Sequence, residues 1–337
     1  MDRIKYEITD ILAGIAGSPD EVGYDVSVSK VYDDIKHARF EEDSSVSFGV
    51  WERELKKADW ELTEKLAVEA LKTKSKDFQI LGWLIEALVV LDGFTGIARG
   101  ITVLTEFSKA FWITGYPRKD DNSSDTEQKQ HICEWIFNIV AQRSKFIPFI
   151  KGDDTVNLYQ YEYALDLKNT AIRSPNSSSE ILENARKDGH STLEDIENKV
   201  NGVSQTEVDS VMTSIGDIRN AKTTLDEAFK EIVDEEFNSF SGLMKNLDTI
   251  ERIMNRKNSK DLDNEAVVKN VDISKRDEIY NKISALSKQL SEIERHSPSS
   301  FILNLVVSWK DKNLIEIMDD LKTGHSEAHK LLKFLVN

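Results

Sequence analysis

Residues 75–100 constrain the fold more than any other stretch, because they are strongly apolar and then carry three glycines. The stretch reads SKDFQILGWLIEALVVLDGFTGIARG. Its apolar run, residues 78–91, is shorter than the roughly 20 residues that a membrane-spanning helix needs, and Glu86 lies inside it. A helix of this length that is apolar on all sides is typical of a bundle core. The sequence therefore predicts a buried core helix and no direct membrane insertion.

The three glycines, Gly93, Gly96 and Gly100, do not form a phosphate-binding loop. Their spacing is G-x-x-G-x-x-x-G, whereas a P-loop requires G-x-x-x-x-G-K-[ST] and a dinucleotide site requires G-x-G-x-x-G after a strand. Gly93 is expected to close the first helix with a left-handed backbone. Gly96 and Gly100 lie one turn apart on the next helix and allow another helix to approach closely. The stretch is therefore predicted to be a helical hairpin inside a core.

The starts of the neighbouring helices also follow from side chains that cap helices. Asp59 is the expected N-cap of a helix that begins at Trp60. Ser75 is expected to cap the core helix, and Asp77 suits the positive N-terminal end of that helix.

The ends of the later helices are marked by prolines. The helix that follows the glycines is expected to end near Trp112, because Tyr116-Pro117 stops it. A further helix is predicted over about residues 127–147, ended by Pro148. Residues 1–150 are therefore predicted to be one α-helical domain of stacked hairpins.

Residues 151–177 are mixed in character and end in a Ser/Asn/Pro stretch, which indicates a connector. Tyr159, Tyr161 and Tyr163 alternate in it as they would in a strand, but one isolated strand in a helical chain is rarely stable. The preferred interpretation is a loop whose aromatic side chains pack on the domain, with a strand as the alternative.

Residues 178–256 are predicted to be a middle helical domain. Ser204 and Glu207 form an S-x-x-E capping box. The apolar residues that follow at helical spacing are Val208, Val211, Met212, Ile215 and Ile218. This narrow stripe on a polar helix suits a long helical hairpin or a coiled-coil-like interface.

The C-terminal part is predicted to be a charged linker, residues 257–273, followed by a small helical unit, residues 274–337. One helix opens at Ser274 and the next at Pro298. A unit of about 60 residues buries little core by itself, so we expect it to oligomerise. The candidate oligomerisation residues are Ile293, His296, Ser297, Pro298, Ile302, Leu305, Trp309, Leu314 and Met318.

Composition excludes several kinds of partner. The formal net charge of -16 repels the phosphates of nucleic acids and the surface of anionic membranes. The single cysteine, Cys133, allows no intramolecular disulfide and lies in an apolar stretch that suits a buried thiol. With no secretory signal at the N-terminus, the cytoplasm is the expected compartment.

Catalytic chemistry is not indicated, and no catalytic, cofactor or metal site is predicted. His325 and His329 are spaced to share a helix face, but no third ligand is evident, so a solvent-facing pair is expected. The acidic clusters Glu41-Glu42-Asp43 and Asp120-Asp121 are expected in polar loops. A metal-dependent hydrolase using the two histidines is the enzyme alternative.

A set of uncommon residues, which we call the motif residues, lies at defined spacing in the first half of the chain: Asp59-Trp60, Ser75-Lys76-Asp77, Trp83-Leu84, Gly93, Gly96-Ile97, Gly100-Ile101, Trp112 and Tyr116-Pro117. With this set, residues 23–117 resemble the ImpA_N domain of the ImpA/VasJ, or TssA, family of bacterial type VI secretion systems.

A second segment, residues 274–321, is similar to the C-terminal part of many members of that family. There one helix ends in Glu-Pro-His-Ser-Pro before the next begins, and here the corresponding residues are Glu294 to Pro298. Arg295 replaces the first proline, and Ser300 stands where another proline is common. By this resemblance His296 is a turn residue rather than a catalyst.

The resemblance implies a function that composition does not give. Proteins of this family are non-enzymatic assembly factors of a contractile, phage-tail-like injector. They associate with its baseplate and membrane complex and coordinate growth of the inner tube and sheath. Their C-terminal regions form rings with the N-terminal domains as arms, so a homo-oligomeric ring through residues 274–337, located in the cytoplasm at the inner membrane, is expected. The alternative is a monomeric helical adaptor that binds partner proteins outside a secretion machine.

Overall fold

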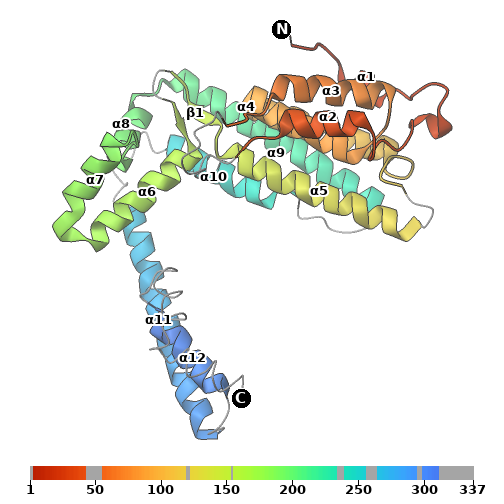
Figure 1. Ribbon diagram of the computed structural model, residues 1–337. Helices are drawn as coiled ribbons and strands as arrows, with labels where there is room; N and C mark the ends of the chain where they lie inside the picture. The colour runs from red at the N-terminus through yellow and green to blue at the C-terminus, as the bar shows by residue number, and fades with distance from the viewer. Residues whose placement is uncertain are drawn as a thin grey trace. The chain divides into compact units, whose positions relative to one another are not determined.

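The protein is described by a computed structural model, which covers residues 3–42, 55–118, 122–152, 155–233, 239–255, 264–293 and 298–310. It is predominantly α-helical, as predicted (Figure 1). The chain divides into two compact units, Met1–Lys257 and Asn258–Asn337.

The first unit opens with short elements and continues with three longer helices. The short elements are α1 (Ile8–Leu12), η1 (Pro19–Glu21) and α2 (Lys30–Arg39), and the longer helices are α3 (Trp60–Thr73), α4 (Phe78–Phe111) and α5 (Asn122–Ser144). Asp59 caps α3 as predicted, because its carboxylate accepts a hydrogen bond from the Leu62 amide at 2.9 Å. Helices α3, α5 and α9 all pack against α4, which is therefore the centre of the unit (Figure 1).

The predicted hairpin is present within α4. The two helical halves of α4 meet at Gly93, which has φ 61° and ψ -131°. After this turn the second half runs back along the first, because Gly100 lies against Ile85 and the rings of Phe78 and Phe107 are 5.1 Å apart between centroids. The positive φ at Gly93 is confirmed, but its ψ lies outside the left-handed helical region that the sequence predicted. Such a backbone is adopted almost only by glycine.

The first half of α4 is a core helix rather than a membrane span. By length and composition alone α4 could cross a bilayer, yet 72% of its most apolar window is buried inside the protein. Gly96 shows how closely the halves pack, since a Cβ atom there would lie 1.9 Å from the carbonyl oxygen of Leu88. The turn and this packing make α4 two short core helices.

The chain then forms a small sheet and a helix in the segment that the sequence assigned to a connector. Strand β1 (Pro148–Ile150) pairs antiparallel with β2 (Val156–Asn157), and α6 (Leu158–Arg173) follows directly. Asn157 caps α6 in a capping box with Gln160, each side chain accepting from the other's backbone amide at 2.9 Å. The loop and strand interpretations of the tyrosines were both wrong, because Tyr161 is buried on a helix whose outer face carries Tyr159 and Tyr163.

The rest of the first unit is α-helical. Its elements are η2 (Pro175–Ser177), α7 (Ser178–Lys187), α8 (Leu193–Gly202), α9 (Gln205–Val233) and α10 (Ser241–Asn255). The predicted capping box opens α9: Glu207 accepts from the Ser204 amide at 3.0 Å and from its hydroxyl at 2.7 Å. Helices α6, α7 and α8 lie together at one end of the unit (Figure 1).

Helices α9 and α10 belong to the same core as residues 1–150, which differs from the predicted separate middle domain. Phe229 of α9 lies 5.7 Å from Trp112 between ring centroids, and Asn246 of α10 donates to the carbonyl of Ala141 at 2.8 Å. The physical reason is the narrow apolar stripe of α9, which is buried against α4 instead of forming its own hairpin.

The second unit contains α11 (Asn264–Ile293) and α12 (Pro298–Ser308), which pack on each other. Helix α11 begins at Asn264, within the segment 257–273 that the sequence assigned to a linker, and α12 begins at Pro298, where the sequence placed it. The candidate residues that lie outside the described residues are His296, Ser297, Leu314 and Met318, together with the histidine pair His325 and His329.

Candidate interaction surfaces

The motif residues of the N-terminal half build the interior of the first unit rather than a chemical site. Lys76 is the clearest example, because it is fully buried and its amine donates to the carbonyls of Ile11 at 2.5 Å and Leu71 at 2.7 Å. Leu71 lies in the last turn of α3, where the helix dipole favours a cation. Burial lowers the pKa of the Lys76 amine to about 8.

The backbone of Lys76 connects two further segments. Its amide donates to the carbonyl of Val22 at 2.8 Å, and its carbonyl accepts from the amide of Tyr116 at 2.8 Å. Lys76 therefore ties together the N-terminal segment, the end of α3 and the residues that follow α4.

Asp77, and not Ser75, is the cap of α4. The Asp77 carboxylate accepts from the amides of Gln79 at 2.8 Å and Ile80 at 3.0 Å. Burial raises the pKa of Asp77 to about 6, against the opposing effect of these two amides. The hydroxyl of Ser75 is buried and has no hydrogen-bond partner within the described part of the chain. The sequence misplaced the cap because both residues are good N-caps two positions apart.

The remaining motif residues also contact their neighbours in the first unit. Arg143 lies 4.9 Å from the ring centroid of Trp60, and the ring centroid of Trp83 lies 4.5 Å from that of Tyr32. Gly93, Gly96 and Gly100 form the α4 hairpin; Trp112 ends α4; and Pro117 follows it after a cis peptide bond.

A buried carboxylate, Glu86, is neutralised by two arginines. It accepts from Arg39 at 2.8 Å and from Arg143 at 2.9 Å, and Arg143 also pairs with Glu41 at 2.7 Å. A buried charge is tolerated when it is paired and hydrogen-bonded in this way. This network joins α2, α4 and α5 and has a structural role.

The described residues contain neither a metal-binding cluster nor an activated cysteine. They contain no cluster of three or more His, Cys, Asp or Glu side chains suited to hold a metal ion. Cys133 is fully buried, and burial raises the pKa of its thiol far above its ordinary value, which is the opposite of what a nucleophilic thiol requires.

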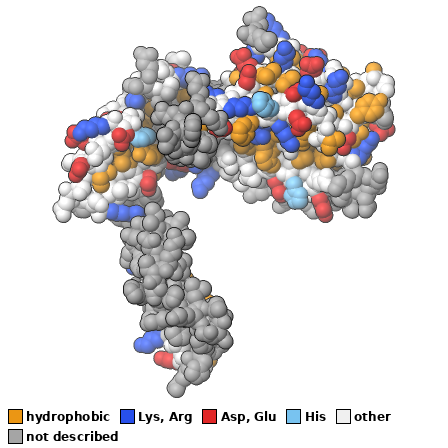
Figure 2. Space-filling view, viewed as in Figure 1, with side chains coloured by type: hydrophobic (Ala, Val, Ile, Leu, Met, Phe, Trp, Pro, Cys, Tyr) orange, Lys and Arg blue, Asp and Glu red, His pale blue; other side chains and the backbone are white. Residues whose placement is uncertain are grey.

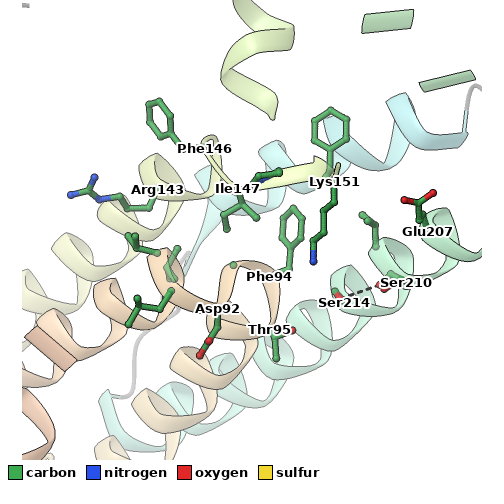
Figure 3. Close-up of a pocket in the computed structure, with 17 residues that line it drawn as sticks. Asp92, Phe94, Thr95, Arg143, Phe146, Ile147, Lys151, Glu207, Ser210 and Ser214 are labelled. Atoms are coloured by element: carbon green, nitrogen blue, oxygen red, sulfur yellow. Dashed lines mark hydrogen bonds between the residues drawn. The ribbon is translucent and has the colours of Figure 1, made fainter. Parts of the chain in front are cut away.

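A pocket with a volume of about 420 Å³ lies at the turn of α4, and we call it the α4-turn pocket (Figure 3). Three parts of the first unit line it: the α4 turn, the segment from α5 through β1, and the start of α9. Its apolar lining residues are Val89, Val90, Leu91, Phe94, Ile147, Pro148, Phe149 and Val211. No sequence pattern reveals this pocket, because its walls come from three separate segments between residues 89 and 214.

The charged residues that line the α4-turn pocket differ in their partners. Arg143 is bound to Glu86 and Glu41, and Figure 3 shows its guanidinium directed away from the other labelled residues. Lys151, by contrast, extends from the end of β1 between Phe94 and α9 (Figure 3). The pocket thus combines apolar walls with a lysine amine, which suits binding rather than catalysis.

An exposed aromatic rim continues from the pocket. It consists of Phe146, Tyr159, Tyr163 and His190. Phe146 stacks on Tyr159 with ring centroids 5.1 Å apart, and Tyr163 contacts His190 at 4.5 Å. Hydrophobic side chains also reach the surface among charged ones over α6 and α7 (Figure 2). Surface aromatics of this kind are enriched in protein–protein interfaces.

The second unit exposes a row of apolar side chains along α11. Ile279, Leu286 and Ile293 recur every seven residues and are 55%, 59% and 80% exposed. Ile283 and Leu290, which lie between them at heptad spacing, are half-buried. This is the a/d pattern of a coiled-coil seam. Among the candidate oligomerisation residues, Ile302 on α12 is 43% exposed, and Trp309, in the turn after α12, is half-buried.

Comparison with known proteins gives two matches. Residues 15–138 match the family model described as ImpA, N-terminal, type VI secretion system. The fold matches a solved structure, the N-terminal domain including the conserved ImpA_N region of the TssA component of the type VI secretion system from Burkholderia cenocepacia. The TM-score is 0.63 at 23% identity, over 75% of this chain and 94% of that chain. The comparison with curated proteins returns no significant match.

These findings first define a class: a predominantly helical protein with an ImpA_N domain, whose fold likeness covers 75% of the chain and so extends beyond the family match. Residues 15–138 thus match the ImpA_N family of type VI secretion systems, and the fold is that of the N-terminal domain of a TssA component. The resemblance of residues 274–321 to the family's C-terminal segment has no counterpart in these matches and stays a prediction.

Proposed function

We propose that this protein is a non-enzymatic scaffold of the type VI secretion system that coordinates baseplate docking and the assembly of tube and sheath. The observation that carries the proposal is the ImpA_N match over residues 15–138. The motif residues within this match build the α4-centred core. Two buried ionisable groups of that core have structural partners: Lys76 donates to backbone carbonyls, and Glu86 pairs with Arg39 and Arg143. This supports a structural role.

The scaffold acts as a homo-oligomer, a ring formed through the second unit. The exposed seam of α11 supports this proposal, because isoleucine and leucine side chains at heptad positions gain about 25 cal/mol per Å² when a second helix covers them. Its partners in this proposal are the baseplate, tube and sheath proteins and the membrane complex, and its location is cytoplasmic at the inner membrane.

A second candidate is a monomeric helical adaptor outside a secretion machine. The α4-turn pocket and its aromatic rim favour it, since both lie in the first unit and neither depends on an oligomer. The adaptor predicts a monomer whose loss leaves secretion intact.

A complementation experiment distinguishes the two. The gene is deleted in its native strain, and release of the inner-tube protein into the medium is measured before and after the gene is restored. We expect release to stop in the deletion strain and to return with the wild-type gene. Unchanged release in the deletion strain would contradict the scaffold function and favour the adaptor.

A further inference from the structure

We propose that the α4-turn pocket docks an apolar side chain of a partner protein, within a segment that carries a carboxylate beside that side chain. The proposal rests on the proposed function, because it gives the chemistry of one partner of the scaffold. Its basis is a preformed apolar cavity, a lysine amine directed into that cavity, and an exposed aromatic rim next to it.

The size and lining of the pocket fit one or two apolar side chains. Its volume of about 420 Å³ lies in the range of known binding pockets, roughly 300–1,000 Å³. Phe94 and Phe149 are buried and form part of the walls, while Val90 is exposed at the rim. An entering leucine or phenylalanine would therefore exchange water for an apolar wall without a rearrangement of the core.

The charge of the occupant follows from the partners of the lining residues. Asp92 binds Arg3 at 2.8 Å, and Glu207 binds the Ser204 hydroxyl at 2.7 Å. Among the described residues, no hydrogen bond or ion pair engages the Lys151 amine. A carboxylate beside the apolar anchor would pair with this amine, whereas a second cation would be repelled. Because the whole chain carries a net charge of -16, a local cation is needed to orient an acidic segment.

The aromatic rim indicates a protein segment rather than a small molecule. Phe146 belongs both to the pocket lining and to the stacked pair with Tyr159, so apolar surface continues from the cavity onto α6. Tyr163 lies one turn further along α6 and extends this surface towards His190. A small ligand would leave the rim in water, while an extended peptide would cover both.

The test measures peptide binding to the full chain by saturation-transfer difference NMR. The probe is acetyl-Glu-Leu-Phe-Glu-amide, which has both apolar anchors and carboxylates. Acetyl-Gln-Leu-Phe-Gln-amide lacks the carboxylates, and acetyl-Glu-Ala-Ala-Glu-amide lacks the anchors. We expect the probe to bind, the loss of the carboxylates to weaken binding about two- to fivefold, and the loss of the anchors to weaken it about tenfold or more.

Variants locate the binding site. Ser210 is an exposed residue of α9 that lines the pocket, so Ser210→Trp fills the cavity and is expected to abolish binding. Thr213→Trp, at an exposed position of the same helix outside the pocket, is the matched control. Lys151→Glu should weaken binding of the acidic probe but not of the neutral peptide, and Lys245→Glu on α10 controls for net charge. Phe146→Ala is a second test should Ser210→Trp fail to fold.

Equal binding of all three peptides, or retention of binding in Ser210→Trp and Phe146→Ala, would overturn the docking proposal. The same variants are then placed in the complementation strain. We expect Ser210→Trp to reduce secretion and Thr213→Trp to leave it intact; normal secretion by a variant that binds no peptide would also overturn the proposal. Unchanged secretion in the deletion strain would instead refute the scaffold function, and the peptide result would stand on its own.

Discussion

Lys76 joins parts of the chain that are far apart in the sequence, and it does so as a buried cation. Its amine satisfies two carbonyl oxygens, and its backbone connects to Val22 and Tyr116. The desolvation cost of the ammonium, seen in its lowered pKa, is offset by these charge-assisted hydrogen bonds. Within the motif Ser75-Lys76-Asp77, the lysine and the aspartate therefore each have a structural role.

Lys76→Met tests this role because it keeps the length and burial of the side chain but removes its donors. The carbonyls of Ile11 and Leu71 would lose their buried partner, so we expect the free energy of unfolding to fall by about 1–3 kcal/mol. Lys74→Met, at an exposed position next to it, should change this free energy by less than about 0.5 kcal/mol. Urea denaturation of both variants measures the difference, and equal midpoints would contradict the structural role.

Asp77 makes stability depend on pH in a direction opposite to most carboxylates. Because its folded pKa of about 6 lies above its ordinary value of 3.8, the folded state binds its proton more tightly than the unfolded state does. Its contribution to stability is fully present below pH 3.8 and is lost as pH rises through about 6.

Asp77→Asn keeps an oxygen that caps α4 but does not titrate. We therefore expect the variant to gain stability relative to wild type between pH 4 and 7, by up to about 3 kcal/mol. Asp77→Ala loses the cap and should be destabilised by about 1 kcal/mol relative to Asp77→Asn at every pH. Thermal unfolding across this pH range measures both, and a pH-independent difference between Asp77→Asn and wild type would show that Asp77 is not desolvated.

At the scale of elements, the turn inside α4 decides whether the apolar run becomes a core hairpin. Gly93 has a backbone conformation that residues with a side chain rarely adopt, and a Cβ atom there would lie 3.1 Å from Ile147. Gly93→Ala is therefore expected to lower the free energy of unfolding by about 1–3 kcal/mol. It should also disturb peptide binding, because Gly93 lines the α4-turn pocket.

Gly216→Ala on α9 is the matched control for Gly93→Ala. Gly216 lies inside a helix and nothing within 4 Å would meet its Cβ atom. We expect this change to stabilise the protein by about 0.5–1 kcal/mol, since alanine loses less backbone entropy in a helix. Chemical denaturation of both variants checks the pair, and equal effects at the two glycines would argue against backbone strain at Gly93.

The sequence predicted the long elements because their signals are local. The apolar run of α4, the glycine at its turn and the caps Asp59 and Ser204 all act within a few residues. Strands β1 and β2 are too short to show a period of two. The Asn157–Gln160 capping box was the available signal for α6, and the alternating tyrosines concealed it.

The packing and the candidate site depended on long-range contacts, which the sequence does not display. From the sequence Lys76 would be placed on the surface, whereas in the structure it is buried and bound to the carbonyls of Ile11 and Leu71. In the same way, the sequence of α9 suggests one arm of a separate hairpin, whereas in the structure its apolar stripe packs against α4. The pocket residues Phe94, Lys151 and Ser210 come from three distant segments, so no sequence pattern links them.

At the scale of the whole molecule, we propose that the first unit binds a partner and the second unit forms the oligomer. The first unit, Met1–Lys257, carries the ImpA_N domain, a large core and the α4-turn pocket, so it can present a partner site on a stable body. The second unit, Asn258–Asn337, exposes isoleucine and leucine at heptad positions of α11. Exposed seams of this kind are stable in water mainly when another helix covers them.

The measurement that tests the scaffold account most directly is the mass of the full chain in solution, by light scattering coupled to size exclusion. The account predicts a closed oligomer that Leu286→Asp and Ile293→Asp dissociate, whereas Ile172→Asp, at an exposed apolar position in the first unit, leaves the mass unchanged. A wild-type protein that stays monomeric at all concentrations, or an oligomer insensitive to both α11 substitutions, would contradict it.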